Sequence, residues 1–198
     1  LEELAEGESV MCREKAGGQD EMRMLRAMYA EGEERLRQAG IEEAGLDAWY
    51  LLEFVTGVDK AHYYMEPDRR MEQSVAQEYE KVVNLRAEHI PLQHITGVQE
   101  FMGLGFRVSG DVLIPRQDTE TLVEEALKTV KPGMKVLDMC TGSGCIIISI
   151  LHNVEGVKGY AVDISKQAVN VAKENAKLNE VPVLFERSDL FEMVTEKF

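Results

Sequence analysis

The residues best suited to bind a ligand follow Lys135–Met139, an apolar run with the composition of a buried strand. The sequence continues Cys-Thr-Gly-Ser-Gly before a helix expected from Cys145 to His152. Small residues at such a turn let the backbone approach a ligand closely, and the N–H groups at a helix start can meet its polar atoms. A strand-to-helix turn without a ligand needs the same residue types, so the motif alone leaves both interpretations open. The candidate ligand-binding residues are Asp138, Cys140, Thr141, Gly142, Ser143 and Gly144.

Two more acidic residues follow the next two expected strands. Asp163 follows Gly159–Val162, while Asp189 and Leu190 follow Val181–Glu186. At the carboxyl ends of a doubly wound sheet, Asp163 would face the crevice and accept hydrogen bonds from both ribose hydroxyls of a ligand. Asp189 would accept from an adenine amino group while Leu190 packs on the ring. The alternatives are a carboxylate at a helix N-terminus for Asp163, worth about 0.3–1 kcal/mol, and an exposed loop acid for Asp189.

The glycine motif also indicates which ribose-containing ligand to expect. A dinucleotide site has the pattern G-x-G-x-x-G, but here Ile147 stands at the third glycine position. That glycine permits close helix–strand packing below a pyrophosphate, so its absence argues against NAD. A ligand without phosphates, such as S-adenosylmethionine, needs less of that geometry. Asp138 would then face its cationic amino-acid end, directly or through water.

The elements that must position these residues alternate between strand and helix. A helix capped by Asp118 is expected over about Thr119–Val130, and three strands and two helices follow it. This alternation predicts a parallel, doubly wound α/β sheet. Before it, helical spacing predicts a small helical bundle, and glycine-punctuated apolar runs predict a β-hairpin. We therefore expect a tail or linker at 1–19, a helical domain at 20–90, a β-hairpin linker at 91–117 and an α/β domain at 118–198.

The composition excludes several classes of partner. Asp and Glu number 36 against 22 Lys and Arg, which gives a net charge of −14. An acidic surface repels phosphate backbones, so direct nucleic-acid binding is not expected. The three cysteines form no CxxC pair, as in a cytoplasmic protein with reduced thiols. No apolar run is long enough to cross a membrane, and the four histidines show no metal-ligand spacing, so no metal is expected.

Several segments resemble one enzyme family in order and wording. They are PLQHITGVQEFMGLGFRV, VLIPRQDTETLVEEAL, VLDMCTGSG, VDIS and SDLFE. Together they resemble the release-factor glutamine methyltransferases of the HemK type, which are protein-(glutamine-N5) methyltransferases. The resemblance covers about residues 20–198. Its most specific segment is IPRQDTE, because methyltransferases in general lack it.

The resemblance implies a helical domain that contacts the substrate and a class I methyltransferase domain of Rossmann-like fold that binds S-adenosylmethionine. It implies methyl transfer to the side-chain amide nitrogen of the glutamine in the Gly-Gly-Gln motif of peptide chain release factors. The cofactor site would comprise Cys140 to Gly144, Asp163, Asp189 and Leu190. Four further residues would lie at the cofactor and substrate mouth: Arg116, Asp118, Thr119 and Glu120.

The chain departs from the family pattern at three places. Cys140 replaces the first glycine of D-x-G-x-G-x-G, which a small residue tolerates if its φ is negative. Gln117 stands where proline is more usual. The family's catalytic Asn-Pro-Pro-Tyr motif, which follows the next strand, does not occur up to Phe198. We therefore expect no catalytic residue in 1–198, no activity of these residues alone, and an exposed sheet edge at Lys135–Met139.

Two other functions remain open from the sequence. An adenine-N6 nucleic-acid methyltransferase would share the cofactor fold and the Asn-Pro-Pro-Tyr motif, although the net charge and the IPRQDTE segment speak against it. A non-catalytic module that keeps only the cofactor-binding half is the second alternative. An Asn-Pro-Pro-Tyr motif soon after Phe198 would favour an enzyme over such a module.

Overall fold

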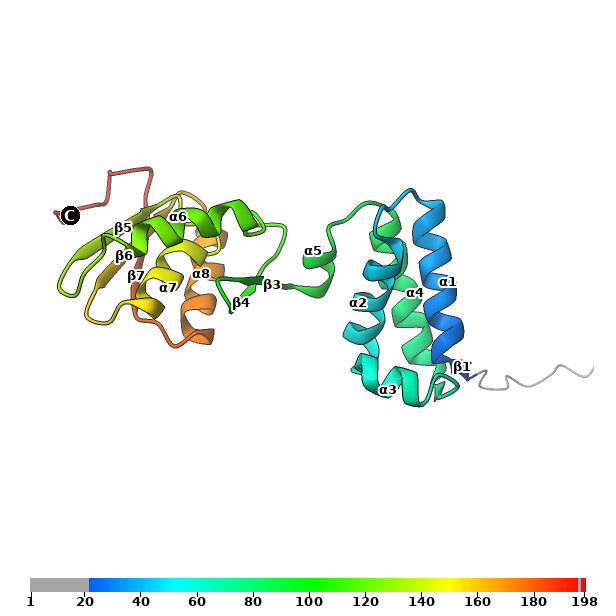
Figure 1. Ribbon diagram of the computed structural model, residues 1–198. Coiled ribbons are helices and arrows are strands. Elements are labelled where there is room, and N and C mark those ends of the chain that lie inside the picture. Colours follow the sequence, from blue (N-terminus) through cyan, green and yellow to red (C-terminus); the bar gives the residue numbers. More distant parts are fainter. Residues whose placement is uncertain (1–21, 196) are drawn as a thin grey trace, which may run out of the picture. The chain divides into compact units, whose positions relative to one another are not determined.

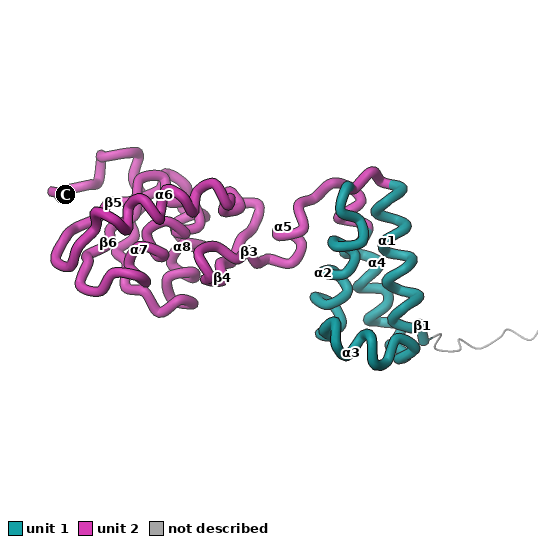
Figure 2. The backbone as a smooth tube through the Cα atoms, viewed as in Figure 1, with its two compact units in different colours: residues 1–38, 42–83 teal, residues 39–41, 84–198 magenta. Residues whose placement is uncertain are grey.

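A computed structural model of the chain describes residues 22–195 and 197–198 (Figure 1). Backbone contacts divide the chain into two units (Figure 2). One unit comprises residues up to 38 together with 42–83, and the other comprises 39–41 together with 84–198. No helix among the described residues is long and apolar enough to cross a membrane. The tail or linker expected at 1–19 lies outside the described residues.

Apolar residues at helical spacing hold the first unit together. Leu25 and Met28 of the first helix are buried, because residues three or four positions apart share one helix face. Gly32 lies on that face and leaves room for Tyr79, since a Cβ at Gly32 would lie 2.1 Å from the Tyr79 hydroxyl oxygen. This hydroxyl donates to the Ala48 carbonyl at 3.2 Å. The helices that begin in this unit are α1 (Leu25–Gln38), α2 (Ala44–Thr56), α3 (Lys60–Met65) and α4 (Gln73–Ala87).

Caps set the helix boundaries of this unit. Gly57 ends α2 in the left-handed conformation, with a φ of 67°, which glycine adopts without strain. The Asp59 carboxylate accepts the His62 backbone N–H at 2.8 Å and so caps the start of α3. A short antiparallel pair, β1 (Arg23–Met24) with β2 (Arg70–Met71), is not predictable from periodicity because each strand has only two residues.

The second unit is built on a three-stranded parallel sheet in the order β5-β6-β7. Parallel strands joined by helices confirm the α/β class expected from the alternating pattern. Strand β5 is one edge of the described sheet, as expected for Lys135–Met139. The elements are α6 (Gln117–Leu127), β5 (Lys135–Met139), α7 (Cys145–Asn153), β6 (Lys158–Asp163), α8 (Lys166–Leu178) and β7 (Val183–Arg187).

One face of this sheet carries the core of the second unit. Ala161 and Phe185 belong to the same apolar cluster as Ile147 of α7, with further members from α6 and α8. Gly159 lets α7 approach the sheet, since a Cβ there would lie 2.5 Å from a methyl carbon of Leu151. The three helices therefore pack on the strands whose carboxyl ends carry the predicted site residues and hold these strands in place.

The predicted hairpin is present and belongs to the second unit. Its two-residue turn is Met102, with a φ of 53°, and Gly103, with a φ of 73°, as in the type I′ turns that suit two-residue hairpins. The structure differs from the linker expected at 91–117, because Phe101 and Phe106 are buried in the core of the second unit. The elements of this segment are α5 (Leu92–Thr96), β3 (Val98–Phe101) and β4 (Leu104–Arg107).

Candidate functional site

The loop at 140–144 connects β5 to α7 at the carboxyl end of the sheet. The Thr141 N–H donates to the Val162 carbonyl at 3.0 Å, and the Gly144 N–H donates back to the Thr141 carbonyl at 2.9 Å. Gly144 has a φ of 81°, and a Cβ there would lie 3.1 Å from the Cβ of Ala172 in α8. Glycine is therefore required both for the turn and for the packing of α8 beside the start of α7.

The carboxylate of Asp163 ties this loop to the neighbouring strand and helix. Its Oδ2 accepts the Gly142 N–H at 2.9 Å, and its Oδ1 accepts the Ser165 N–H at 2.9 Å. Ser165 is the N-cap of α8, so the carboxylate lies both at the loop and at a helix start. An ionised carboxylate has about four lone-pair sites. Two sites are left to accept hydrogen bonds from the hydroxyls of a ligand.

A second carboxylate, Asp138, lies beneath the same loop. It accepts a hydrogen bond from the Thr141 hydroxyl at 2.7 Å. Burial raises the pKa of Asp138 above its ordinary value, hydrogen bonds from the Thr141 hydroxyl and the Ile147 backbone N–H oppose this rise, and the Asp163 carboxylate adds to it. Two neighbouring carboxylates favour a cationic ligand group and disfavour a phosphate. The hydrogen bonds of Asp138 run to Thr141 and to the start of α7.

Cys140 adopts a conformation that differs from the expected one. Its φ is +60°, whereas a negative value was expected for a small side chain in place of the glycine. The chain reverses here so that the next N–H reaches β6, and a residue other than glycine costs about 1–2 kcal/mol in this region. The Cys140 thiol is free and exposed, and the Cys145 thiol is free and buried. Burial raises the pKa of Cys145 to about 11, so this thiol stays protonated.

The turn after β7 meets the same edge of the sheet. The Ser188 N–H donates to the Asp163 carbonyl at 3.0 Å, and the Ser188 hydroxyl donates to the Leu190 carbonyl at 2.8 Å. The side chains of Asp189 and Leu190 are exposed, and Leu190 has a positive φ of 47°. The structure therefore brings the glycine loop, the Asp163 carboxylate and this turn to the ends of three adjacent strands.

The four residues expected at the mouth lie around the start of α6. Arg116 occupies the N-cap position without a capping side-chain bond, and Asp118 lies inside the first turn. The cap predicted at Asp118 is therefore wrong, because the helix begins one residue before it. The Thr119 N–H donates to the Arg116 carbonyl at 3.0 Å, and the Glu120 carboxylate accepts the Met102 N–H at 2.7 Å. The Glu120 contact fastens the hairpin turn to α6, and neither of the two contacts runs to the glycine loop.

A residue that the sequence analysis did not single out also reaches the loop. Asn175 of α8 is fully buried, and its Nδ2 donates to the Ser143 carbonyl at 2.9 Å. The sequence signal that could have identified Asn175 is its position, since Ala172 and Ala176 lie beside it on the buried face of α8. A polar side chain on such a face must find hydrogen-bond partners.

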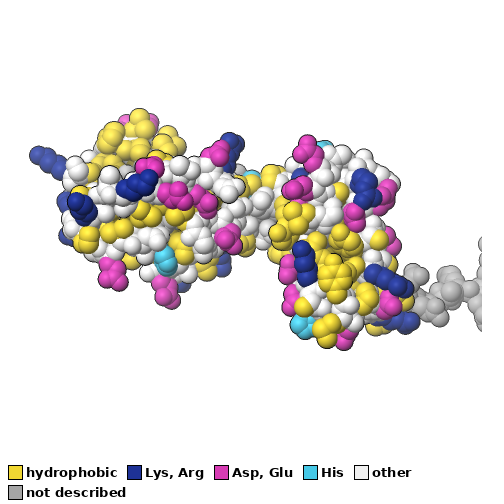
Figure 3. All heavy atoms as spheres, viewed as in Figure 1, with side chains coloured by type: hydrophobic (Ala, Val, Ile, Leu, Met, Phe, Trp, Pro, Cys, Tyr) yellow, Lys and Arg dark blue, Asp and Glu magenta, His cyan; other side chains and the backbone are white. Residues whose placement is uncertain are grey.

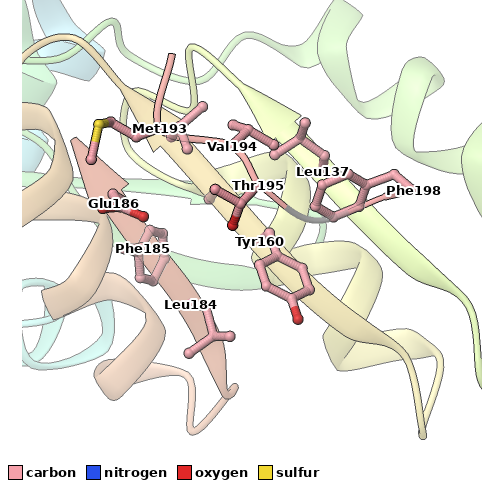
Figure 4. A pocket seen from close by; sticks show the side chains of 11 residues that line it. Leu137, Tyr160, Leu184, Phe185, Glu186, Met193, Val194, Thr195 and Phe198 are labelled. Atoms are coloured by element: carbon pink, nitrogen blue, oxygen red, sulfur yellow. The ribbon is translucent and has the colours of Figure 1, made fainter. Parts of the chain in front are cut away.

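A cavity of about 280 Å³ lies away from these residues, on the opposite face of the sheet. Leu137, Tyr160 and Leu184 point into it from the three strands, and Phe198 lies over it (Figure 4). The rings of Tyr160 and Phe198 meet edge to face with centroids 5.1 Å apart. None of the residues predicted to bind a ligand lines this cavity, so it is separate from the carboxyl-edge site.

The acidic residues of the site do not combine with other side chains into a metal centre. Within 22–195 and 197–198, no group of three or more His, Cys, Asp or Glu side chains could hold a metal ion. Of the histidines, His62 contacts the Asp59 carboxylate at 2.9 Å as part of the α3 cap. The polar partners of Asp138 and Asp163 described above are hydroxyl and backbone groups.

Comparison with known proteins matches both parts of the chain to methyltransferase families. Residues 27–97 match the family described as PrmC N-terminal domain, and residues 117–196 match ribosomal protein L11 methyltransferase (PrmA). The chain is 37% identical to the release factor glutamine methyltransferase of Moorella thermoacetica over 155 residues, covering 77% of this chain and 55% of that protein. For the release factor glutamine methyltransferase of Geobacter sulfurreducens the identity is 36% over 157 residues, covering 79% and 55%.

A solved structure similar to part of this chain is the tRNA (uracil-54, C5)-methyltransferase of Pyrococcus abyssi in complex with S-adenosyl-L-homocysteine. It covers 46% of this chain and 23% of its own, at a TM-score of 0.41 and 19% sequence identity. The chain spans about half the length of the curated relatives that it matches.

The parallel sheet, the helices on one of its faces and the match over residues 117–196 define a class I methyltransferase fold of Rossmann-like type. A helical unit precedes this fold in the sequence. Its match to the PrmC N-terminal domain over residues 27–97 indicates which methyltransferases the chain resembles. Over most of its length the chain is similar to release factor glutamine methyltransferases, of which it covers about half. The expected fold class and the resemblance to this family are thereby confirmed.

The positive φ of Cys140 predicts the effect of substitutions there. Cys140→Gly removes about 1–2 kcal/mol of left-handed strain and adds about 0.5–1 kcal/mol of backbone entropy cost. We therefore expect the free energy of unfolding of the chain, measured in urea, to rise by up to about 1.5 kcal/mol. Cys140→Val should lower it, because a β-branched residue avoids positive φ.

Cys140→Ser is the matched control, because serine has a similar size and meets the same strain. Its free energy of unfolding should stay within about 0.5 kcal/mol of the natural chain. A valine variant as stable as the glycine variant would contradict a left-handed residue at this position.

Proposed function

We propose that this chain forms the cofactor-binding and partner-binding parts of an S-adenosylmethionine-dependent methyltransferase. Its substrate would be the glutamine in the Gly-Gly-Gln motif of peptide chain release factors, methylated at N5. The carboxylate of Asp163 carries the proposal, because it holds the glycine loop through the Gly142 N–H at the carboxyl edge of the sheet. The names of the relatives, release factor glutamine methyltransferases, support the choice of substrate.

The site suits S-adenosylmethionine better than a dinucleotide. Asp163 keeps acceptor capacity for ribose hydroxyls, and Asp189 with Leu190 stands beside it for an adenine ring. Buried Ile147 occupies the position of the third glycine that a pyrophosphate site requires. The charges of Asp138 and Asp163 would repel a pyrophosphate and attract ammonium and sulfonium groups. When bound, S-adenosylmethionine supplies an electrophilic methyl group on a positively charged sulfur.

Methylation of a glutamine amide requires a catalytic motif in addition to the residues that bind the methyl donor. The amide nitrogen of glutamine is a weak nucleophile because its lone pair is delocalised, so catalysis depends on positioning and on hydrogen bonds accepted from the amide. The Asn-Pro-Pro-Tyr motif does not occur in the 198 residues, and we assign no catalytic residue within them. In this proposal Cys140 to Gly144, Asp163, Asp189 and Leu190 bind and orient the methyl donor, and Arg116 to Glu120 line the substrate side.

We propose that the helical unit contacts the release factor. Leu46, Tyr50 and Phe54 lie on successive turns of α2 and are 40%, 46% and 51% exposed. Hydrophobic side chains gather on the surface of this unit (Figure 3). Contiguous apolar surface of this kind marks interaction sites, and the net charge of −14 suits a basic protein partner. The free thiols of Cys140 and Cys145 suit a cytoplasmic protein.

The role of Asp163 is testable by calorimetry with S-adenosylhomocysteine on the full-length chain. Asp163→Ala should weaken binding by about 1.5–3 kcal/mol, the worth of a hydrogen bond to a charged group. Asp163→Asn keeps one acceptor oxygen and should lose less. Glu174→Ala removes an exposed carboxylate of α8 and should bind as the natural chain does. An unchanged affinity in Asp163→Ala would remove this residue from the site.

Methyl transfer tests the substrate. A version of the chain completed after Phe198 with the Asn-Pro-Pro-Tyr motif is incubated with isotopically labelled S-adenosylmethionine and a release factor, and the modified residue is located by mass spectrometry. We expect label on the Gly-Gly-Gln glutamine and none on a release factor whose glutamine is replaced by alanine. Label on adenine in added DNA or RNA, with none on the release factor, would instead indicate a nucleic-acid methyltransferase. Cofactor binding without any transfer would indicate a binding module.

A further inference from the structure

Asn175 joins two segments that are far apart in the sequence. Its side chain is completely buried. Its Oδ1 accepts the Arg107 N–H at 2.6 Å, and its Nδ2 donates to the Arg107 carbonyl at 3.0 Å. The same Nδ2 donates to the Ser143 carbonyl at 2.9 Å. One amide therefore binds both the end of the β3–β4 hairpin and the glycine loop.

These bonds use the full donor capacity of the amide. An asparagine Nδ2 has two N–H donors, and here each one reaches a different segment. Burying an amide is unfavourable unless its hydrogen bonds are satisfied, so an apolar residue would fill this position if packing alone mattered. The Oδ1 and one N–H meet the N–H and carbonyl of the same residue, Arg107, as a neighbouring backbone would. The second N–H is the group that extends the contact to the loop.

The Ser143 carbonyl lies at a decisive point of the loop. It directly precedes Gly144, where the backbone turns with a φ of 81° into α7. One residue earlier, the Gly142 N–H is held by Asp163. Two peptide groups of the loop, 141–142 and 143–144, are thus fixed from two sides, by a carboxylate of β6 and by an amide of α8. This sets the directions in which the loop N–H groups point.

We propose that Asn175 is a positioning residue of the cofactor site. It holds the glycine loop in its ligand-binding conformation through Ser143 and couples that conformation to the hairpin through Arg107. The inference rests on the proposed function for the identity of the ligand. The loop conformation itself can be measured without any ligand, so the two proposals can fail separately.

Asn179 supplies the matched control. It lies one turn further along the chain, just after α8, and its Nδ2 donates to the Gly105 carbonyl of the hairpin and to the Asn175 carbonyl, both at 3.0 Å. Asn179→Ala therefore removes a hairpin contact of the same chemical type without touching the loop. Val123 of α6 is a second control, because it is buried in the apolar core of the second unit, to which Ala176 of α8 also belongs. Val123→Ala lowers global stability without removing a polar contact.

The experiment combines hydrogen exchange of loop amides with binding of S-adenosylhomocysteine, both on the full-length chain. Asn175→Ala should speed exchange of the amides at 141–144 and weaken binding by about tenfold each, as expected when a buried hydrogen bond is lost. Asn179→Ala and Val123→Ala should stay within about twofold of the natural chain in both measurements. Asn175→Ser, which cannot span both segments, replaces the alanine variant if that variant does not fold.

The outcomes separate the two proposals. Loop exchange and affinity like those of the natural chain in Asn175→Ala and Asn175→Ser would overturn the inference. Equal losses in Val123→Ala would also overturn it, because the effect would then follow global stability alone. If the natural chain does not bind S-adenosylhomocysteine, the proposed function fails, and faster loop exchange in the Asn175 variants alone would still support the positioning of the loop.

Discussion

The Asp163 carboxylate accepts two backbone N–H groups, and the arrangement of the candidate site depends on these two bonds. One bond holds Gly142 in the glycine loop, and the other holds Ser165 at the start of α8. Hydrogen bonds to an ionised acceptor are shorter and stronger than neutral ones. Because β6 lies between β5 and β7, its terminal carboxylate is central to the edge where all three connections meet. A ligand at this edge would find a loop that is already in place.

The candidate site combines features that are unfavourable for folding but would favour binding of a cationic ligand. Cys140 is held at a positive φ, and burial together with the Asp163 carboxylate raises the pKa of Asp138. Backbone strain and shifted pKa values gather at functional sites because the surrounding fold supports them. Here that support comes from the hydrogen bonds of Thr141 and Asp163 and from the core below α7. A cationic ligand would relieve the repulsion between the two carboxylates.

Local sequence patterns predicted the parts of the fold that depend on neighbouring residues. Lys135–Met139 forms a strand with the expected bounds, because an apolar run acts over a few neighbouring positions. The sequence did not predict Asn175, whose bonds to Arg107 cross 68 positions. The conformation of Cys140 was not predictable either, since its positive φ depends on the hydrogen bond between the Thr141 N–H and the Val162 carbonyl of β6. The cap expected at Asp118 was wrong, because α6 begins at Gln117. The segment expected to be a linker is instead part of the second unit, because the rings of Phe101 and Phe106 are buried in its core.

The central claim is that the glycine loop and Asp163 hold an adenosyl ligand at the carboxyl edge of the sheet. A crystal structure of the full-length chain grown with S-adenosylhomocysteine tests it most directly. The account predicts ligand density beside residues 140–144, with both ribose hydroxyls within hydrogen-bond distance of the Asp163 carboxylate. Density instead in the cavity between Tyr160 and Phe198, with nothing at the loop, would contradict it.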